Sequence, residues 1–153
     1  MQSRYAVRRF RLADMERVLE IEVASFGKDA YDRKLFAEYW RQCGGLFLLA
    51  GRPKIDGYSI VCISKRRGCL VASLESIAVD PQARGEGAAS SLLESTMRRL
   101  KLRGVSRITL MVRHSNSVAL QFYERRGFTA VRRAPGYYED GEEGLLMRKD
   151  LTL

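Results

Sequence analysis

The hydrophobic pattern along the chain switches repeatedly between the short apolar runs of strands and the wider spacing of amphipathic helices. Strand-like runs, in which apolar residues are continuous or alternate with polar ones, occupy residues 5–10, 46–50, 57–64, 68–79, 107–112, 128–132 and 145–148. Helical spacing occupies residues 14–24, 35–43, 116–126 and a long stretch from the glycines near 85 to 102. The predicted order is β-α-α-β-β-β-α-β-α-β-β, in which the strand after the long helix lies parallel to the strand before it.

Residues 72–102 form the centre of this pattern. The strand ends near Val79, because Asp80-Pro81 follows and proline has no N–H to donate to a sheet. Gly85 and Gly87 then precede the helix. A strand, a glycine turn and a helix in this order direct free N–H groups and a positive helix end at one point. The pattern favours a phosphate site, although a plain tight turn before an amphipathic helix has the same spacing.

Two well-known phosphate motifs do not match this turn. A Walker A loop requires Gly-Lys-Ser/Thr, which the sequence lacks. The dinucleotide fingerprint requires glycine or alanine where Ser90 stands, and an acidic residue about 20 positions later, near Ser106 and Arg107. If the turn binds phosphate, it therefore does so through another kind of motif.

Three ordered motifs together resemble the GNAT superfamily of acetyl-CoA-dependent N-acetyltransferases. Gln82 to Gly87 fits Gln/Arg-x-x-Gly-x-Gly/Ala, the loop that holds the pyrophosphate of coenzyme A in that family. The stretch from His114 to Phe128 is similar to its second signature, and Gly136 to Glu143 is similar to the tail of its protein N-terminal branch, the ribosomal-protein-alanine type. The resemblance covers roughly residues 5 to 150.

The resemblance implies an α/β (α+β) architecture, the GNAT acyltransferase fold. In this fold a mixed sheet of about seven strands, splayed at its middle parallel pair, is flanked by about four helices. We expect residues 1–153 to form a single N-acetyltransferase domain, since this length suits one ordinary domain.

The co-substrate implied by the resemblance is acetyl-CoA, with no metal. Strand residues would bond the pantetheine arm through the main chain, the glycine loop would hold the pyrophosphate, and Asn116 would bond the pantetheine or thioester end. The predicted binding residues are Ile77, Ala78, Val79, Arg84, Gly85, Glu86, Gly87, Ala88, Ala89, Asn116 and Tyr123. Arg125 or Arg126 either reaches the outer phosphate or is ordinary solvated surface charge.

Two catalytic residues are predicted, Tyr123 and Glu75. Tyr123 lies where the family's general acid is found and can donate a proton to the departing sulfur; the alternative is a tyrosine that only packs beside Phe122. Met111 stands where relatives often have a glutamate or histidine base, and methionine cannot accept a proton. Glu75 is the nearest titratable substitute, unless it is only solvent-facing or salt-bridged, and Glu22 and Asp29 are weaker candidates.

The predicted acceptor is the α-amine of a peptide or protein N-terminus, contacted by Tyr137, Tyr138 and Glu139. An α-amine titrates near 7.7–8.0 and lysine near 10.4, so roughly a tenth of chain termini are uncharged at neutral pH, against fewer than about one lysine in a thousand. A site without a strong base therefore suits a terminus better. The alternatives are a small-molecule amine acetyltransferase, acting on a polyamine, aminoglycoside or amino acid, and a non-catalytic acetyl-CoA-binding module.

Charge adds a second partner class to these expectations. With 27 Lys and Arg against 18 Asp and Glu, the formal net charge is +9, which favours anionic partners. We expect weak attraction to RNA or the ribosome, without a helix-turn-helix or an aromatic single-strand platform for specific readout.

Cysteine usage and hydropathy predict a reducing, cytoplasmic setting. The three cysteines are an odd set without metal-ligand spacing and are predicted to be reduced thiols, with Cys62 and Cys69 able to face each other across a hairpin turning at Lys65-Arg66. A lone histidine, His114, makes a zinc site improbable. No apolar run approaches the roughly 20 residues of a membrane span, and the charged N-terminus does not resemble a signal peptide.

Overall fold

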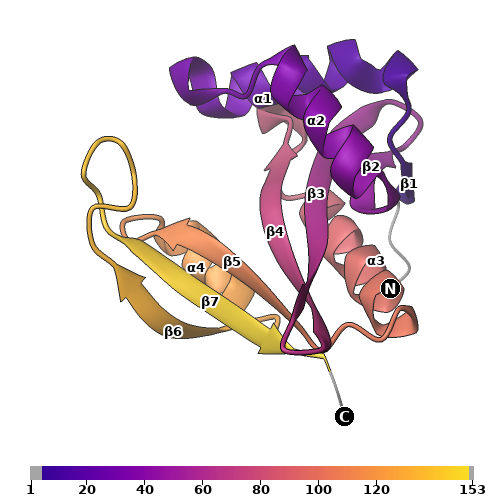
Figure 1. Cartoon of the computed structure of the whole chain (residues 1–153). Coiled ribbons are helices and arrows are strands. Elements are labelled where there is room, and N and C mark those ends of the chain that lie inside the picture. The colour runs from indigo at the N-terminus through magenta and orange to yellow at the C-terminus, as the bar shows by residue number, and fades with distance from the viewer. Residues whose placement is uncertain (1–4, 152–153) are drawn as a thin grey trace.

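A computed structural model describes residues 5–151 and contains one mixed sheet with helices on both faces (Figure 1). The strands are β1 (Ala6–Arg9), β2 (Phe47–Gly51), β3 (Ile55–Arg66), β4 (Cys69–Val79), β5 (Arg107–Arg113), β6 (Thr129–Ala134) and β7 (Gly144–Asp150). The α-helices are α1 (Met15–Phe26), α2 (Arg33–Cys43), α3 (Ala88–Leu102) and α4 (Ser117–Glu124). The seven strands lie in the order β1-β2-β3-β4-β5-β7-β6, and β4 and β5 are the parallel pair. The predicted order of elements and the central parallel pair are confirmed.

The two faces of the sheet carry different helices, and strand β2 shows why. Phe47 and Leu49 pack in one cluster with apolar residues of α1 and α2, whereas Leu48 and Ala50 pack in another with α3. Successive side chains of a strand point to opposite faces, so α1 and α2 cover one face and α3 covers the other. The continuous apolar run of β2 therefore reflects burial on both sides.

The parallel strands β4 and β5 separate along their length. They pair only from Val71–Arg107 to Ser73–Thr109, although β4 continues to Val79 and β5 to Arg113. Figure 1 shows the two ribbons meeting near the start of β5 and diverging toward their carboxyl ends. Past Ser73, the backbone edge of β4 that would face β5 therefore has no strand partner within residues 5–151.

A β-bulge at Glu75 reorients the last residues of β4. The register moves from Val61–Leu74 to Ile60–Ser76, which leaves Glu75 as an extra residue. Beyond the bulge, Ala78 packs with the α1 and α2 cluster, while Ile77 packs against the α3 side.

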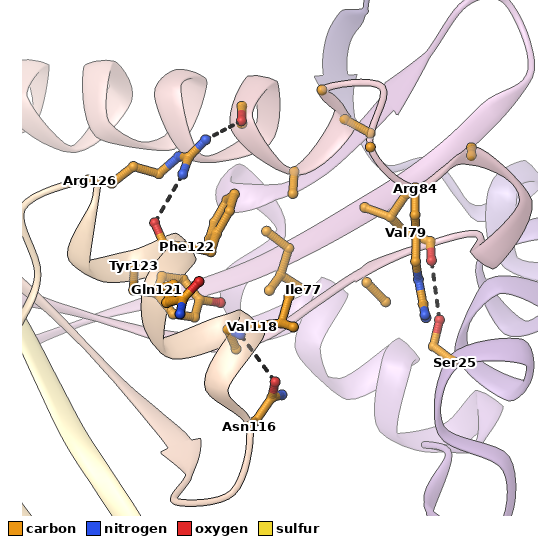
Figure 2. A pocket seen from close by; sticks show the side chains of 18 of the residues that line it. Ser25, Ile77, Val79, Arg84, Asn116, Val118, Gln121, Phe122, Tyr123 and Arg126 are labelled. Carbon is orange, nitrogen blue, oxygen red and sulfur yellow. Dashed lines mark hydrogen bonds between the residues drawn. The ribbon is translucent and has the colours of Figure 1, made fainter.

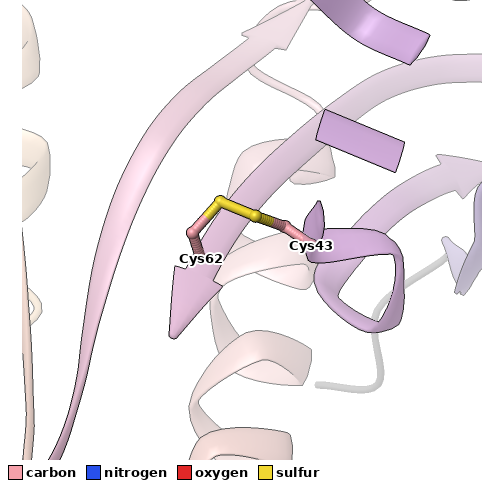
Figure 3. The surroundings of a disulfide bond; sticks show 2 residues. All are labelled: Cys43 and Cys62. Atoms are coloured by element: carbon pink, nitrogen blue, oxygen red, sulfur yellow. A yellow bond between two sulfur atoms is a disulfide. The ribbon is translucent and has the colours of Figure 1, made fainter. Parts of the chain in front are cut away.

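The structure corrects the prediction that all three cysteines are reduced thiols. Cys43 ends α2 and Cys62 lies in β3, and both pack against the aromatic core on the α1–α2 face. They form a disulfide with 5.1 Å between their Cα atoms (Figure 3). Local spacing does not indicate this pair, because tertiary packing alone brings the end of α2 onto β3. Cys69 is an exposed free thiol.

The turn between β3 and β4 also differs from the prediction. Arg67 and Gly68 have φ values of 50° and 80°, which places the turn two residues later than Lys65-Arg66. Cys69 therefore pairs with Arg66, and Cys62 does not face it. Within residues 5–151, no helix is both long enough and apolar enough to cross a bilayer.

Candidate active site

A cleft of about 980 Å³ lies between the end of β4, the start of α3 and helix α4 (Figure 2). It is lined by most of the predicted coenzyme A residues: Ile77, Ala78, Val79, Arg84, Gly85, Gly87, Ala88, Ala89, Asn116 and Tyr123. Glu86 is not among the lining residues, and its carboxylate forms an ion pair with Arg52. The structure thus brings together residues that lie more than 40 positions apart in the sequence.

The start of α3 presents unsatisfied donors to this cleft. Gly85 and Gly87 have φ values of 81° and 100°, a backbone conformation that glycine adopts without strain. Their N–H groups, and those of Ala88 and Ala89, donate to no acceptor among residues 5–151. With the positive end of the α3 dipole behind them, these donors favour an anion.

The middle of the cleft offers donors and acceptors of a second kind. The side chains of Ile77 and Val79 point into it (Figure 2), and the β4 backbone next to them has no partner strand on the β5 side. Asn116 caps α4, since its Oδ1 accepts the Ala119 N–H at 3.1 Å. Its Nδ2 amide is therefore the part of Asn116 that can donate to a ligand.

Tyr123 lies at the inner wall of the cleft. Its side chain is only 6% exposed and packs edge-on between Phe122 and Phe128, with ring centroids 5.2 and 5.5 Å away. Burial raises the pKa of Tyr123 to about 12, with the nearby Arg126 acting in the opposite direction. The phenol therefore keeps its proton at neutral pH.

Arg126 is held in place in the cleft wall. Its guanidinium lies 3.7 Å above the centroid of the Phe122 ring and donates to the Phe122 carbonyl at 3.0 Å. It also donates to the hydroxyl of Ser90 on α3. Because these bonds connect α4 with α3, Arg126 is more than a solvated surface charge, whereas Arg125 is exposed at the rim.

A second group of polar residues lies on the α1–α2 face, across the sheet from the cleft. Glu75 belongs to this group and is not among the residues that line the cleft. Tyr31, in the segment before α2, places its hydroxyl 3.4 Å from the Glu75 carbonyl. Burial, followed by the neighbouring Tyr31 and Glu75, raises the pKa of Tyr39 to about 12. We call Tyr31, Tyr39 and Glu75 the tyrosine cluster.

Sequence reasoning named neither Tyr31 nor Tyr39 as a site residue. Tyr31 contacts Phe36 and Tyr39, with ring centroids 5.8 and 6.1 Å away. An aromatic residue that directly follows a polar glycine-containing segment was the available signal.

Glu22 lies beneath the tyrosine cluster and is 1% exposed. Its Oε2 accepts the Tyr31 N–H at 2.9 Å, and its Oε1 accepts the hydroxyl of Tyr58. Burial raises the pKa of the Glu22 carboxyl, against the effect of these two donors. The carboxylate therefore anchors the segment before α2. Asp29, the other minor candidate for a base, is exposed in that segment.

The loop between β6 and β7 is held by Arg113. Its guanidinium donates to Asp140 and Glu142 at 2.8 and 2.9 Å and lies 4.1 Å from the centroid of the Tyr138 ring. Tyr137 is 56% exposed and stacks edge-on against Tyr138. Two of the loop's carboxylates are therefore neutralised.

The remaining acids of this loop differ in their environments. Glu143 lies 3.8 Å from the guanidinium of Arg133. Glu139 is exposed, and among the described residues it is the one carboxylate of this loop without an ion pair.

Met111, in β5, packs against the end of this loop. A Cβ placed on Gly144 would come within 2.9 Å of the Met111 sulfur and 3.3 Å of the Tyr137 Cβ. Gly144 is thus required by close packing, and Met111 lies beside the exposed Tyr137. At this position the chain offers an apolar contact and no proton acceptor.

The divergence of β4 and β5 lies between the two groups of residues. On the α3–α4 face are free N–H donors suited to phosphate, and on the α1–α2 face are tyrosines around Glu75. An anionic ligand and a cationic one can therefore approach the same gap in the sheet from opposite faces.

Comparisons with known proteins agree with this architecture. A model of the acetyltransferase (GNAT) family matches residues 15–128. An uncharacterized N-acetyltransferase of Methanocaldococcus jannaschii is 33% identical over 145 residues, covering 94% of this chain and 90% of the relative. An N-alpha-acetyltransferase of Saccharolobus solfataricus is 31% identical, covering 96% of this chain and 93% of the relative.

Solved structures give the same result for the fold. The crystal structure of the ribosomal-protein-S18-alanine N-acetyltransferase from Escherichia coli has a TM-score of 0.84 and 26% identity, covering 97% of this chain and 95% of that one. The Ard1 structure from Thermoplasma volcanium has a TM-score of 0.87 at 23% identity. The sheet and its flanking helices thus have the GNAT fold, and the chain belongs to the acetyltransferase (GNAT) family.

Proposed function

We propose that this chain transfers the acetyl group of acetyl-CoA to the α-amine of a protein or peptide N-terminus. The observation that carries the proposal is the placement of two unlike half-sites on opposite faces of the β4–β5 gap. The N–H groups at the start of α3 suit the diphosphate of coenzyme A, and the tyrosine cluster with Tyr137 suits an extended peptide that begins with a cation. Relatives named as N-alpha-acetyltransferases support this acceptor class.

Each residue then has a defined role in the transfer. The amine nitrogen attacks the thioester carbonyl carbon, forming the C–N bond as the C–S bond breaks. Tyr123 donates its proton to the departing thiolate. The ammonium proton formed by the attack leaves through Glu75 or water, so the products are an N-acetyl amide and a free thiol. Tyr123 regains its proton from solvent.

The lack of a proton acceptor in the Met111 side chain supports an N-terminal acceptor over lysine. Met111 offers no proton acceptor, which leaves Glu75, on the acceptor side of the β4–β5 gap, as the candidate base. An α-amine is already uncharged in roughly a tenth of molecules at neutral pH, whereas lysine is uncharged in fewer than about one in a thousand. Such a site acetylates the group that needs least help in losing a proton.

Matched peptides test the acceptor. One peptide has a free α-amine and no lysine, and a second has the same sequence with a blocked α-amine and one lysine. We expect thiol release from acetyl-CoA with the first peptide and at least about a hundredfold less with the second, in line with their uncharged fractions. Equal rates with both peptides, or turnover with polyamines, aminoglycosides or amino acids alone, would refute the N-terminal assignment.

Tyr123→Phe tests the chemistry. Loss of a general acid lowers kcat by about 10²- to 10⁴-fold. Because the ring and its packing remain, we expect the coenzyme A dissociation constant measured by calorimetry to stay within about twofold of the unaltered protein. Tyr137→Phe is the matched control, since its hydroxyl is exposed and has no role in proton transfer. An unchanged kcat in Tyr123→Phe would exclude the tyrosine as the acid, and no turnover by the unaltered protein would favour a non-catalytic acetyl-CoA-binding module.

A further inference from the structure

Much of the positive charge is concentrated at one end of the molecule. From Thr96 to Arg113 the sequence contains six Lys or Arg residues and no Asp or Glu, and the β3–β4 turn adds Lys65–Arg67. The Ser106 N–H and hydroxyl both donate to the Leu70 carbonyl, at 2.9 and 3.0 Å, which holds the start of β5 beside the hairpin. Figure 1 shows the β3–β4 turn and the α3–β5 connection at the same end, opposite the β6–β7 loop. We call Lys65–Arg67 together with Arg98–Arg103 the basic end.

The cations of the basic end lack the acidic partners found elsewhere. On other surfaces arginines are paired, for example Arg17 with Asp80 at 2.8 Å. Among residues 5–151, no side chain of the basic end forms an ion pair. The nearby Asp150 lies 3.3 Å from the guanidinium of Arg148 instead.

Within the basic end, like charges face one another. Burial, then Arg103, Arg9 and Arg98, lower the pKa of Arg99. Arg103 also extends over the turn after α2, since a Cβ on Gly45 would lie 3.0 Å from its guanidinium. Charges of one sign grouped without counter-charges create a strong local potential that attracts anions.

We propose that the basic end is a docking surface for the phosphate backbone of RNA. Its exposed cations are spread over a turn and a helix end, and although Arg98 also lines a small cavity beside Arg126 and Lys149, this spread suits an extended polyanion better than a small anion. A membrane surface fits less well, because Leu102 is the one large exposed hydrophobic residue of the basic end. The choice of RNA over DNA rests on the proposed function, since protein N-termini emerge from ribosomes, whose surface is largely RNA. Figure 1 shows the basic end where β4 and β5 meet, whereas the cleft lies at the other end of β4, so a ligand at the basic end need not cover it.

Two charge-matched triple variants test the surface. K65Q/R66Q/R67Q removes the hairpin cations, and K28Q/K34Q/R41Q removes three exposed cations of the α1–α2 region, so each lowers the net charge of +9 by three. Binding is followed by fluorescence anisotropy with a labelled RNA hairpin of about 20 base pairs over a range of salt concentrations. Each lost phosphate contact reduces the slope of log K against log salt by about 0.9. We therefore expect the slope for the hairpin variant to be smaller by about 2 to 3 and its RNA affinity to be at least about tenfold lower. The RNA affinity of the control variant should fall by less than about twofold.

The outcomes separate this proposal from the proposed function. Equal losses of RNA affinity in both triple variants would show that net charge alone is responsible for binding. Unchanged RNA binding by the hairpin variant would refute the basic end as the docking surface. Tighter binding to DNA of the same sequence, or to vesicles of phosphatidylserine, would overturn the choice of RNA. Acetylation of a short peptide is expected to be the same in the hairpin variant and the unaltered protein. RNA binding without any peptide acetylation would leave the basic end standing and remove the N-terminal acceptor.

Discussion

Replacing Glu22 by glutamine or alanine separates the hydrogen-bonding role of this buried carboxylate from its charge. Its two oxygens accept the Tyr58 hydroxyl and the Tyr31 N–H, and the Tyr58 oxygen also lies 3.1 Å from the hydroxyl of Ser76. In Glu22→Gln the amide oxygen can accept the Tyr31 N–H while the amide nitrogen donates to the Tyr58 oxygen. The Tyr58 proton then turns to Ser76, so every donor keeps an acceptor.

Glu22→Ala leaves a different set of partners. Tyr58 retains Ser76, but the Tyr31 N–H is left without an acceptor in a part-buried site, which costs about 1–3 kcal/mol at most. The glutamine variant should stay within about 1 kcal/mol of the unaltered protein, because its polar groups remain satisfied. Urea unfolding measures the free energy of unfolding of both variants. A glutamine variant as unstable as the alanine variant would refute this account of the hydrogen bonds.

The pH dependence of stability, compared between the unaltered protein and Glu22→Gln, tests the effect of the Glu22 charge. Burial raises the folded-state pKa of Glu22 above its unfolded value near 4.3, so the folded protein binds the proton more tightly than the unfolded chain. The stabilisation that this provides is complete below the unfolded pKa and is lost as pH rises through the folded pKa. The stability of the unaltered protein relative to Glu22→Gln should therefore fall as pH increases from about 4 upward. A difference that is constant with pH would refute the raised pKa.

Three shorter predictions concern peptide binding, the disulfide and the glycine turn. In Glu22→Ala, loss of the bond to Tyr31 should raise the peptide KM while the coenzyme A dissociation constant stays unchanged in calorimetry; an equal change in both would show a general loss of structure. Cys43→Ser should lower the free energy of unfolding by about 3 kcal/mol, the effect of opening a loop that closes over 19 residues, whereas Cys69→Ser should not change it; equal effects in urea would contradict the pairing. Gly87→Ala places a Cβ at a φ of 100° and should lower the free energy of unfolding by about 1–2 kcal/mol. It should also weaken coenzyme A binding in calorimetry, and an unchanged coenzyme A affinity would argue against a phosphate site at this turn.

The order of elements was accessible from the sequence because local signals agreed with tertiary packing. Asp80-Pro81 ends β4, and the glycines after it start α3, as predicted. Residues whose role depends on long-range packing were not accessible. The disulfide between Cys43 and Cys62 depends on how α2 crosses β3, and no local spacing indicates that crossing.

Glu75 shows why alternation alone could not position the candidate base. The period of two predicts that Ser73, Glu75 and Ile77 share one face of β4. The bulge inserts Glu75 as an extra residue, so Ile77 lines the coenzyme cleft while Glu75 contacts the tyrosines of the opposite face. Without the bulge, either Glu75 would point into the coenzyme cleft or Ile77 would point away from it. Under the proposed function, the bulge lets one strand contact the anionic co-substrate on one face of the sheet and the cationic acceptor on the other.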